Sequence, residues 1–144
     1  MPRTIILDTD FIIKITNDPL PRFDYHKLAL EFTLSTTPSV VSELEGLSRQ
    51  KNSSAGRRAR NALRLLQEPS GSQGRITILK TDSRSKNKRE ADEDLLELAR
   101  KNPEEYLIAT MDHSLLSRLE VEGLRYLTLR NDGPLFSRSA GDRV

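Results

Sequence analysis

Cysteine and tryptophan are both missing from this chain of 144 residues, and only 5% of its residues are aromatic. Without cysteine there is no disulfide, thiolate metal ligand or cysteine nucleophile, which excludes disulfide scaffolds and cysteine-dependent enzymes and fits a cytosolic protein. No apolar run approaches the roughly 20 residues that a membrane-spanning helix needs. No strand is followed by G-x-G-x-x-G, and G-x-x-x-x-G-K-[ST] does not occur, so the common nucleotide-binding loops are excluded.

Acidic and basic residues are unevenly distributed, although the formal net charge is only +2. Residues 49–89 contain twelve Lys and Arg against two acids, a net charge of +10, and the rest of the chain carries −8. A polyanionic partner would explain the basic segment, and a divalent cation would explain the acidic flanks. Solvated helix faces that happen to segregate by charge explain the same pattern equally well.

Short apolar segments alternate with segments of helical period, and the length predicts one domain. Strands are predicted over Thr4–Leu7, 75–79, 106–110 and 125–129. Helices are predicted from Phe11 with Thr9 or Asp10 as the cap, over 24–34, from Ser39 as a cap, and over 57–67, 91–100 and 114–121. Residues 50–56, 69–74 and 81–89 are predicted to be loops. The alternation indicates an α/β fold with a parallel sheet.

Four acids are expected near the carboxyl edge of this sheet, where parallel α/β folds bind ligands. Asp8 directly follows the first strand and Asp112 follows the strand over 106–110, while Glu43 and Asp92 lie near helix starts. Four bare carboxylates would repel one another, and Mg²⁺ or Mn²⁺ would relieve that repulsion. The simpler alternative is that the acids cap helices and interact with helix dipoles.

Four segments in order resemble the PIN-domain nucleases, over about residues 4–130. They are the strand and LDTDFI at 7–12, PSVVSELEGL at 38–47, ADEDLLELA at 91–99, and IATMD at 108–112. The resemblance implies a three-layer α/β/α sandwich with a central parallel sheet, formed by residues 1–131. Residues 132–144 are expected to form a loosely ordered tail.

The resemblance also implies a metal-dependent phosphodiesterase. Asp8, Glu43, Asp92 and Asp112 would be catalytic and would hold Mg²⁺ or Mn²⁺, with Asp94 in reserve as a ligand. Asp10, which stands where the family usually has Asn, and Thr110 would hydrogen-bond the ligands. His26 and His113 are expected to lie outside the chemistry.

Within the family, the basic stretch GRRAR and the last strand resemble PIN proteins that process ribosomal RNA in the small-subunit processome. The partner would be RNA, with a ribosomal precursor as substrate, and the location cytoplasmic, or nucleolar in a eukaryote. The family also includes homodimers. The residues expected to bind phosphates are Arg57, Arg58, Arg60, Arg64, Lys86, Lys88 and Arg89. Two other functions stay open: a non-catalytic RNA-binding PIN protein of ribosome assembly, and the ribonuclease of a toxin–antitoxin pair.

Overall fold

One six-stranded sheet runs through the centre of the protein in the computed structural model, which describes residues 3–18, 23–67, 75–80, 88–130 and 133–137. The strand order is β3-β2-β1-β4-β5-β6. Neighbouring strands are parallel except for β6, which pairs antiparallel with β5 at one edge. The strands are β1 (Thr4–Leu7), β2 (Thr33–Thr36), β3 (Ile76–Ile78), β4 (Tyr106–Ala109), β5 (Tyr126–Arg130) and β6 (Gly133–Phe136).

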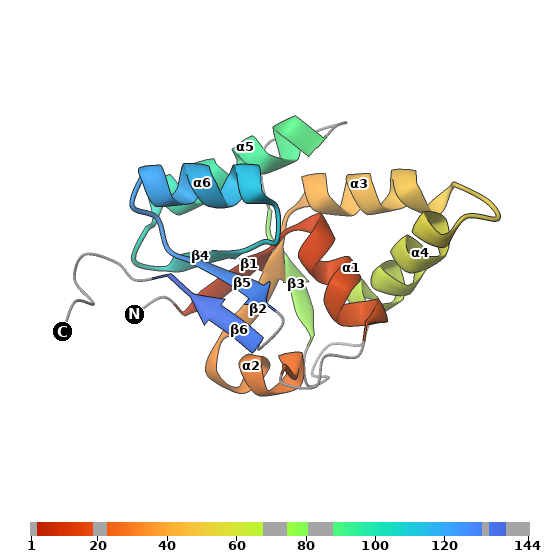
Figure 1. The fold of residues 1–144 in the computed structure, drawn as a ribbon, viewed down its shortest axis with the longest axis horizontal. Helices are drawn as coiled ribbons and strands as arrows, with labels where there is room; N and C mark the ends of the chain where they lie inside the picture. The colour runs from red at the N-terminus through yellow and green to blue at the C-terminus, as the bar shows by residue number, and fades with distance from the viewer. Residues whose placement is uncertain (1–2, 19–22, 68–74, 81–87, 131–132, 138–144) are drawn as a thin grey trace.

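Helices cover both faces of the sheet and complete three layers (Figure 1). One face is covered by α5 and α6, which lie side by side (Figure 1). The other packs against α1, α3 and α4, with α2 at its margin. The helices are α1 (Thr9–Asn17), α2 (Tyr25–Glu31), α3 (Pro38–Ser48), α4 (Ser54–Leu66), α5 (Lys88–Lys101) and α6 (His113–Val121). The predicted α/β/α sandwich is confirmed, and its central sheet is parallel as predicted except for the edge strand β6.

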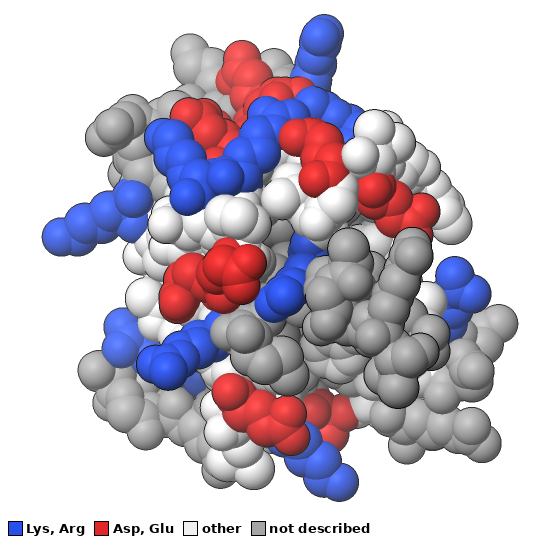
Figure 2. Space-filling view, turned by 90° about the vertical axis from the view of Figure 1, so that its left-hand side faces the viewer, with Lys and Arg blue, Asp and Glu red and all other residues white. Residues whose placement is uncertain are grey.

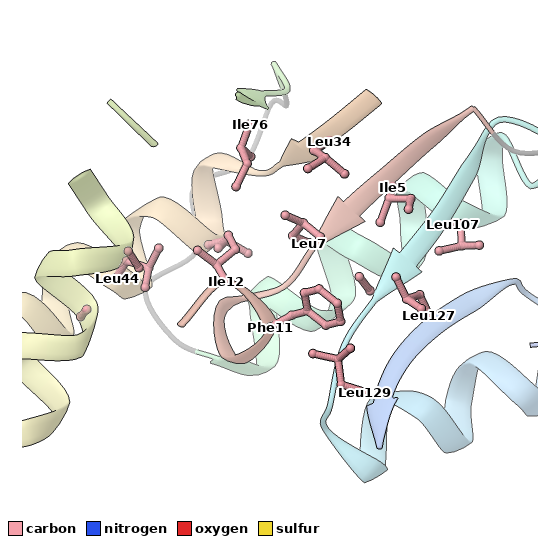
Figure 3. Close-up of a cluster of buried hydrophobic side chains, with 14 residues drawn as sticks. Ile5, Leu7, Phe11, Ile12, Leu34, Leu44, Ile76, Leu107, Leu127 and Leu129 are labelled. Carbon is pink, nitrogen blue, oxygen red and sulfur yellow. The ribbon is translucent and has the colours of Figure 1, made fainter. Parts of the chain in front are cut away.

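Strand β1 explains why the sheet needs helices on both faces. Its side chains alternate between two cores: Ile5 and Leu7 join the cluster around Phe11 (Figure 3), and Ile6 joins the cluster under α5 and α6. All four residues of β1 are buried. Each buried aliphatic side chain contributes about 1.5–3 kcal/mol relative to exposure. The chain leaving β1 is therefore held firmly where Asp8 begins.

Two strands were not predicted. β2 lies where the sequence indicated the end of a helix over 24–34, because helix α2 ends at Glu31 and the chain turns into the sheet. β6 lies in the segment assigned to a loosely ordered tail. Its backbone pairs with β5 from Leu127 to Arg130. The short sequence GPLF alone does not predict this pairing.

Several helix starts differ from the prediction by one to three residues. The N-cap of α1 is Asp8 rather than Thr9 or Asp10, and that of α3 is Thr37 rather than Ser39. Helix α4 begins at Ser54, inside the predicted loop 50–56. Helix α5 begins at Lys88, inside the predicted loop 81–89. Residues 81–87 of that loop lie outside the described residues, as does the predicted loop 69–74.

The face where α5 and α6 end carries interleaved acidic and basic side chains (Figure 2). Ion pairs join the two helices: Arg118 to Glu93 at 2.6 Å and Arg100 to Glu122 at 2.5 Å. In each of these pairs the positive charge of the arginine is offset by a carboxylate. None of the described helices is both long and apolar enough to span a membrane.

Candidate active site

Asp8 lies at the junction between β1 and α1, at the carboxyl edge of the sheet. Its backbone amide extends the pairing of β1 with β4 by donating to the Ala109 carbonyl at 3.0 Å. Its Oδ1 accepts the amide proton of Phe11 at 2.9 Å and so caps α1. Its side chain is almost fully buried. Asp8 is therefore a fixed carboxylate in an apolar setting.

Asp112 lies at the same edge, because β4 is parallel to β1 and directly beside it. Its Oδ1 caps α6 by accepting the amides of Ser114 and Leu115 at 2.8 and 3.2 Å. Thr110 connects the two acids. Its buried hydroxyl donates to Oδ2 of Asp8 and accepts the backbone amide of Asp112 at 3.1 Å. The two acids thus follow neighbouring strands at the same edge, as the parallel strand direction predicted, and Thr110 connects Asp8 to the backbone of Asp112.

Burial raises the pKa of Asp8 from 3.8 to about 7. The hydrogen bonds from Thr110 and from the Phe11 amide lower this pKa, but desolvation outweighs them. The negative charges of Asp10 and Asp92 raise it further. None of the described side chains that shift the pKa of Asp8 is positively charged. No cation among them therefore offsets the charge of the ionised carboxyl group.

Glu43 comes to this edge from α3 through a contact that the sequence did not reveal. The Thr9 hydroxyl donates to Oε2 of Glu43 at 2.7 Å, although the two residues are 34 positions apart. Thr9 is buried and directly follows Asp8. Thr9 appeared in the motif LDTDFI only as a candidate helix cap, so its partner became visible only in the folded chain.

Asp92 and Asp94 occupy different sides of α5. Asp92 precedes the buried residues Leu95, Leu96 and Ala99 by three, four and seven positions, which places it on the sheet-facing side of the helix. Its charge acts on Asp8. Asp94 instead accepts a hydrogen bond on Oδ2 from the buried Ser39 hydroxyl of α3. Ser39 is a second contact residue that sequence reasoning missed.

No group of three or more His, Asp or Glu side chains within the described ranges is gathered closely enough to hold a metal ion. Binding of one ion by all four predicted carboxylates therefore stays a prediction. The capping alternative holds for Asp8 and Asp112, each of which caps a helix. Capping does not exclude metal binding, because a carboxylate has two oxygens and about four lone pairs.

The predicted phosphate-binding arginines of α4 divide into two pairs. Arg58 forms a bidentate ion pair with Asp18 of α1 at 2.8 and 3.0 Å, and Arg60 donates to the Ser48 carbonyl at 2.8 Å. Arg57 and Arg64 are exposed. The Asp18 pair holds the pKa of that carboxyl well below its usual range. Arg58 and Arg60 thus have structural contacts, whereas Arg57 and Arg64 face solvent.

The remaining predicted residues lie around the start of α5 or on helix surfaces. Arg89 is exposed in the first turn of α5, Lys86 lies outside the described residues, and Lys88 is described only in its backbone. His26 stacks on Tyr25 and contacts Asp24 at 3.2 Å on the exposed side of α2. His113 is exposed at the start of α6.

No family model matches the sequence, and no curated protein matches it. A solved structure described as the PIN domain endonuclease Utp24 is similar to this chain, with a TM-score of 0.69 and 24% sequence identity. The similarity covers 95% of this chain and 92% of that one. It therefore extends over nearly the whole of both chains. The four motifs thus indicated the right architecture, and the chain has the fold of a PIN domain.

Proposed function

We propose that this chain is a metal-dependent endoribonuclease that acts at the carboxyl edge of β1 and β4. One observation carries the proposal: the Thr110 hydroxyl joins the buried Asp8 carboxylate to the backbone of Asp112. The similarity of the fold to Utp24, itself described as an endonuclease, supports the same reaction class. The motifs that resemble PIN proteins of ribosomal-RNA processing make precursor ribosomal RNA the candidate substrate.

The donors at this edge fit a hard divalent cation such as Mg²⁺ or Mn²⁺. They are carboxylates, which these ions prefer as ligands. Asp8 is buried near other acids whose charge a cation would offset. Mg²⁺ usually keeps several waters and is held by one or two carboxylates together with substrate phosphates, so a closed cluster of protein ligands is not required. When bound, such an ion supplies a water of lowered pKa and offsets charge on the leaving oxygen.

The side chains of the site have separate roles in this proposal. Asp8, Glu43, Asp92 and Asp112 would hold the cation. Thr110 and Thr9 orient the carboxylates of Asp8 and Glu43 through their hydroxyl protons. Such partners fix the direction of a ligand before the metal arrives. The proposal assigns no histidine as a base; His26 and His113 are both exposed.

RNA would be held by the α3–α4 arm, which comprises residues 38–66. The arm projects at the opposite end of the molecule from α6 (Figure 1). Between Gly46 and Gln67 the sequence has six basic residues and no acid. The exposed members of this set are Arg49, Lys51, Arg57 and Arg64.

The turn of the arm is held by a close backbone approach and by a side-chain hydrogen bond. A Cβ on Gly56 would lie 2.0 Å from the Gln50 carbonyl oxygen, so only glycine allows this close approach. Arg60, in the middle of α4, ties this helix to the end of α3 by donating to the Ser48 carbonyl. Exposed cations of this kind bind the phosphate backbone without reading bases.

The activity is tested by incubating the protein with a single-stranded RNA that is blocked at both ends, in the presence of Mg²⁺ or Mn²⁺. A parallel reaction contains excess EDTA. We expect internal cleavage that requires the metal. Glu43→Gln should abolish cleavage, whereas Glu45→Gln, which removes an exposed acid of the same helix, should not. Metal-dependent RNA binding without any cleavage by the wild type would instead support the non-catalytic RNA-binding protein.

The arm is tested by measuring RNA affinity against salt concentration. Arg57→Ala combined with Arg64→Ala should weaken binding and flatten the log–log salt slope by about 0.7 for each lost phosphate contact on single-stranded RNA. Lys27→Ala combined with Arg130→Ala removes the same charge from exposed positions outside the arm and should leave the slope unchanged. Equal slopes for both double variants would remove the arm from RNA binding.

A further inference from the structure

Three buried hydroxyl groups each donate to an acid on a different structural element around the candidate site. Thr110 donates to Asp8 and Thr9 donates to Glu43. The third hydroxyl is that of Ser39, which is 1% exposed and donates to Oδ2 of Asp94. The first two acids belong to the predicted metal ligands. Asp94, predicted only as a reserve ligand, thus accepts the same kind of hydrogen bond as two of the predicted ligands.

The geometry of α5 separates Asp94 from Asp92. Residues two positions apart project about 200° apart around a helix, so the two side chains cannot face the same ligand. Asp92 shares the sheet-facing side with Leu95 and Leu96. Asp94 lies on the flank that meets the first turn of α3, where Ser39 is located. Only Asp92 therefore points toward the edge that holds Asp8.

The flank contact restrains a part of α5 that has few apolar anchors. Among the described side chains of α5 that precede Leu95, one is buried, that of Ala91. A small alanine side chain allows rotation of the helix about its axis more readily than a packed leucine does. The hydrogen bond from Ser39 to Asp94 opposes that rotation, because it ties α5 laterally to α3, the helix that carries Glu43.

We propose that Ser39 is a positioning residue: by holding Asp94, it fixes the rotation of α5 so that Asp92 faces Asp8, and Asp94 is an anchor and no metal ligand. This inference rests on the proposed function, because it assigns Asp92 to the metal. It also decides between Asp92 and Asp94, which the sequence left open. Loss of a partner that hydrogen-bonds a metal ligand directly typically changes metal affinity by about 10- to 100-fold, and Ser39 acts one step farther out, through Asp94, so its loss should come at the lower end, about 10-fold.

The test is Mn²⁺ binding by calorimetry, with no RNA present. Ser39→Ala should weaken binding about 10-fold, the lower end of the range for direct partners of a ligand. Ser35→Ala is the matched control, because Ser35 is equally buried, lies on β2, and its hydroxyl has no hydrogen-bond partner in the described part of the chain. It should bind Mn²⁺ as the wild type does. Equal affinity of Ser39→Ala and the wild type would overturn the inference.

Substitutions of the two acids separate an anchor from a ligand. Asp94→Asn keeps an oxygen that accepts the Ser39 proton, so Mn²⁺ affinity should be unchanged, whereas Asp92→Asn should lose it. The double variant Ser39→Ala with Asp94→Ala should bind Mn²⁺ no more weakly than either single variant, because each substitution alone already removes the hydrogen bond between the two side chains. Loss of affinity in Asp94→Asn with retention in Asp92→Asn would reverse the assignment and overturn the inference.

Hydrogen exchange of α5 gives a readout that does not depend on the metal. Ser39→Ala should speed amide exchange in the first two turns of α5 and leave exchange in α6 unchanged. A wild type that binds Mn²⁺ without cutting RNA would overturn the proposed activity and leave the inference intact. A wild type that binds no Mn²⁺ would overturn both.

Discussion

The Thr110 hydroxyl donates a hydrogen bond to Oδ2 of Asp8, across 102 positions of sequence. The same oxygen of Thr110 accepts the backbone amide of Asp112. One side chain thus joins the ends of β1 and β4 and satisfies a buried carboxylate. The part of the candidate site formed by Asp8, Thr110 and Asp112 is therefore built into the sheet edge.

Loss of this hydroxyl should destabilise the protein. Thr110→Val keeps the volume and the β-branched shape, but it leaves a buried carboxyl oxygen and the Asp112 amide without their partner. The free energy of unfolding should fall by about 1–3 kcal/mol in urea titrations. Thr110→Ser should retain most of the stability. Equal stability of Thr110→Val and the wild type would show that the bridge contributes nothing.

Asp8→Asn should be more stable than the wild type at pH 8 without divalent ions. The folded pKa of Asp8 is raised to about 7, above its unfolded value of 3.8, so the folded state penalises the charged form. The wild type should lose about 1.4 kcal/mol per pH unit relative to the variant as pH rises between roughly 4 and 7.

Urea unfolding of both proteins at pH 4 and pH 8, in EDTA, measures this difference. The stability advantage of Asp8→Asn over the wild type should be smallest at pH 4 and largest at pH 8. Added Mn²⁺ should restore stability to the wild type alone. A wild type whose stability relative to Asp8→Asn rises with pH would contradict the assigned burial penalty.

The Asp18–Arg58 pair should stabilise the protein only above acidic pH. Hydrogen bonds from Arg58 and Lys14 lower the pKa of Asp18 in the folded state. Its contribution is therefore fully present above the unfolded pKa, near 4, and is lost as pH falls below that value. Asp18→Asn should be less stable than the wild type at pH 7 and approach it at pH 2 to 3 in urea titrations. A difference independent of pH would rule out the ion pair as its source.

Removal of the Ser35 hydroxyl should cost no stability. Ser35 lies in β2 beside Ile6 of β1, 1% exposed, and its Oγ has no partner among the described residues. A buried hydroxyl without a hydrogen bond carries a desolvation cost that alanine lacks. Ser35→Ala should match or exceed the wild type in thermal unfolding. A loss of more than about 1 kcal/mol would reveal a partner such as a buried water.

The sequence predicted those elements whose signal is local. Strands β1 and β4 are continuous apolar runs; the structure places β1 at the predicted residues and ends β4 at Ala109, one residue before the predicted end. Strand β2 has the sequence TLST, with Leu34 as its single apolar residue, and becomes a strand only because it pairs with β1 and β3. Strand β6 likewise depends on its pairing with β5.

The same distinction applies to the candidate site. Parallel strand direction was enough to place Asp8 and Asp112 at one edge. The hydroxyl partners Thr9 and Ser39 were not predictable, because they depend on how α3 packs against α1 and α5. Charge counting likewise could not show that Arg58 is paired with Asp18 while Arg57 faces solvent.

The most direct measurement of the central claim is the rate of internal RNA cleavage by wild type and Asp8→Asn with saturating Mn²⁺. The wild type should cut the RNA, and the variant, folded and at least as stable at pH 8, should not cut it at a detectable rate. Equal cleavage by the two proteins would contradict a metal nuclease centred on Asp8, as would a wild type that cuts equally well in EDTA.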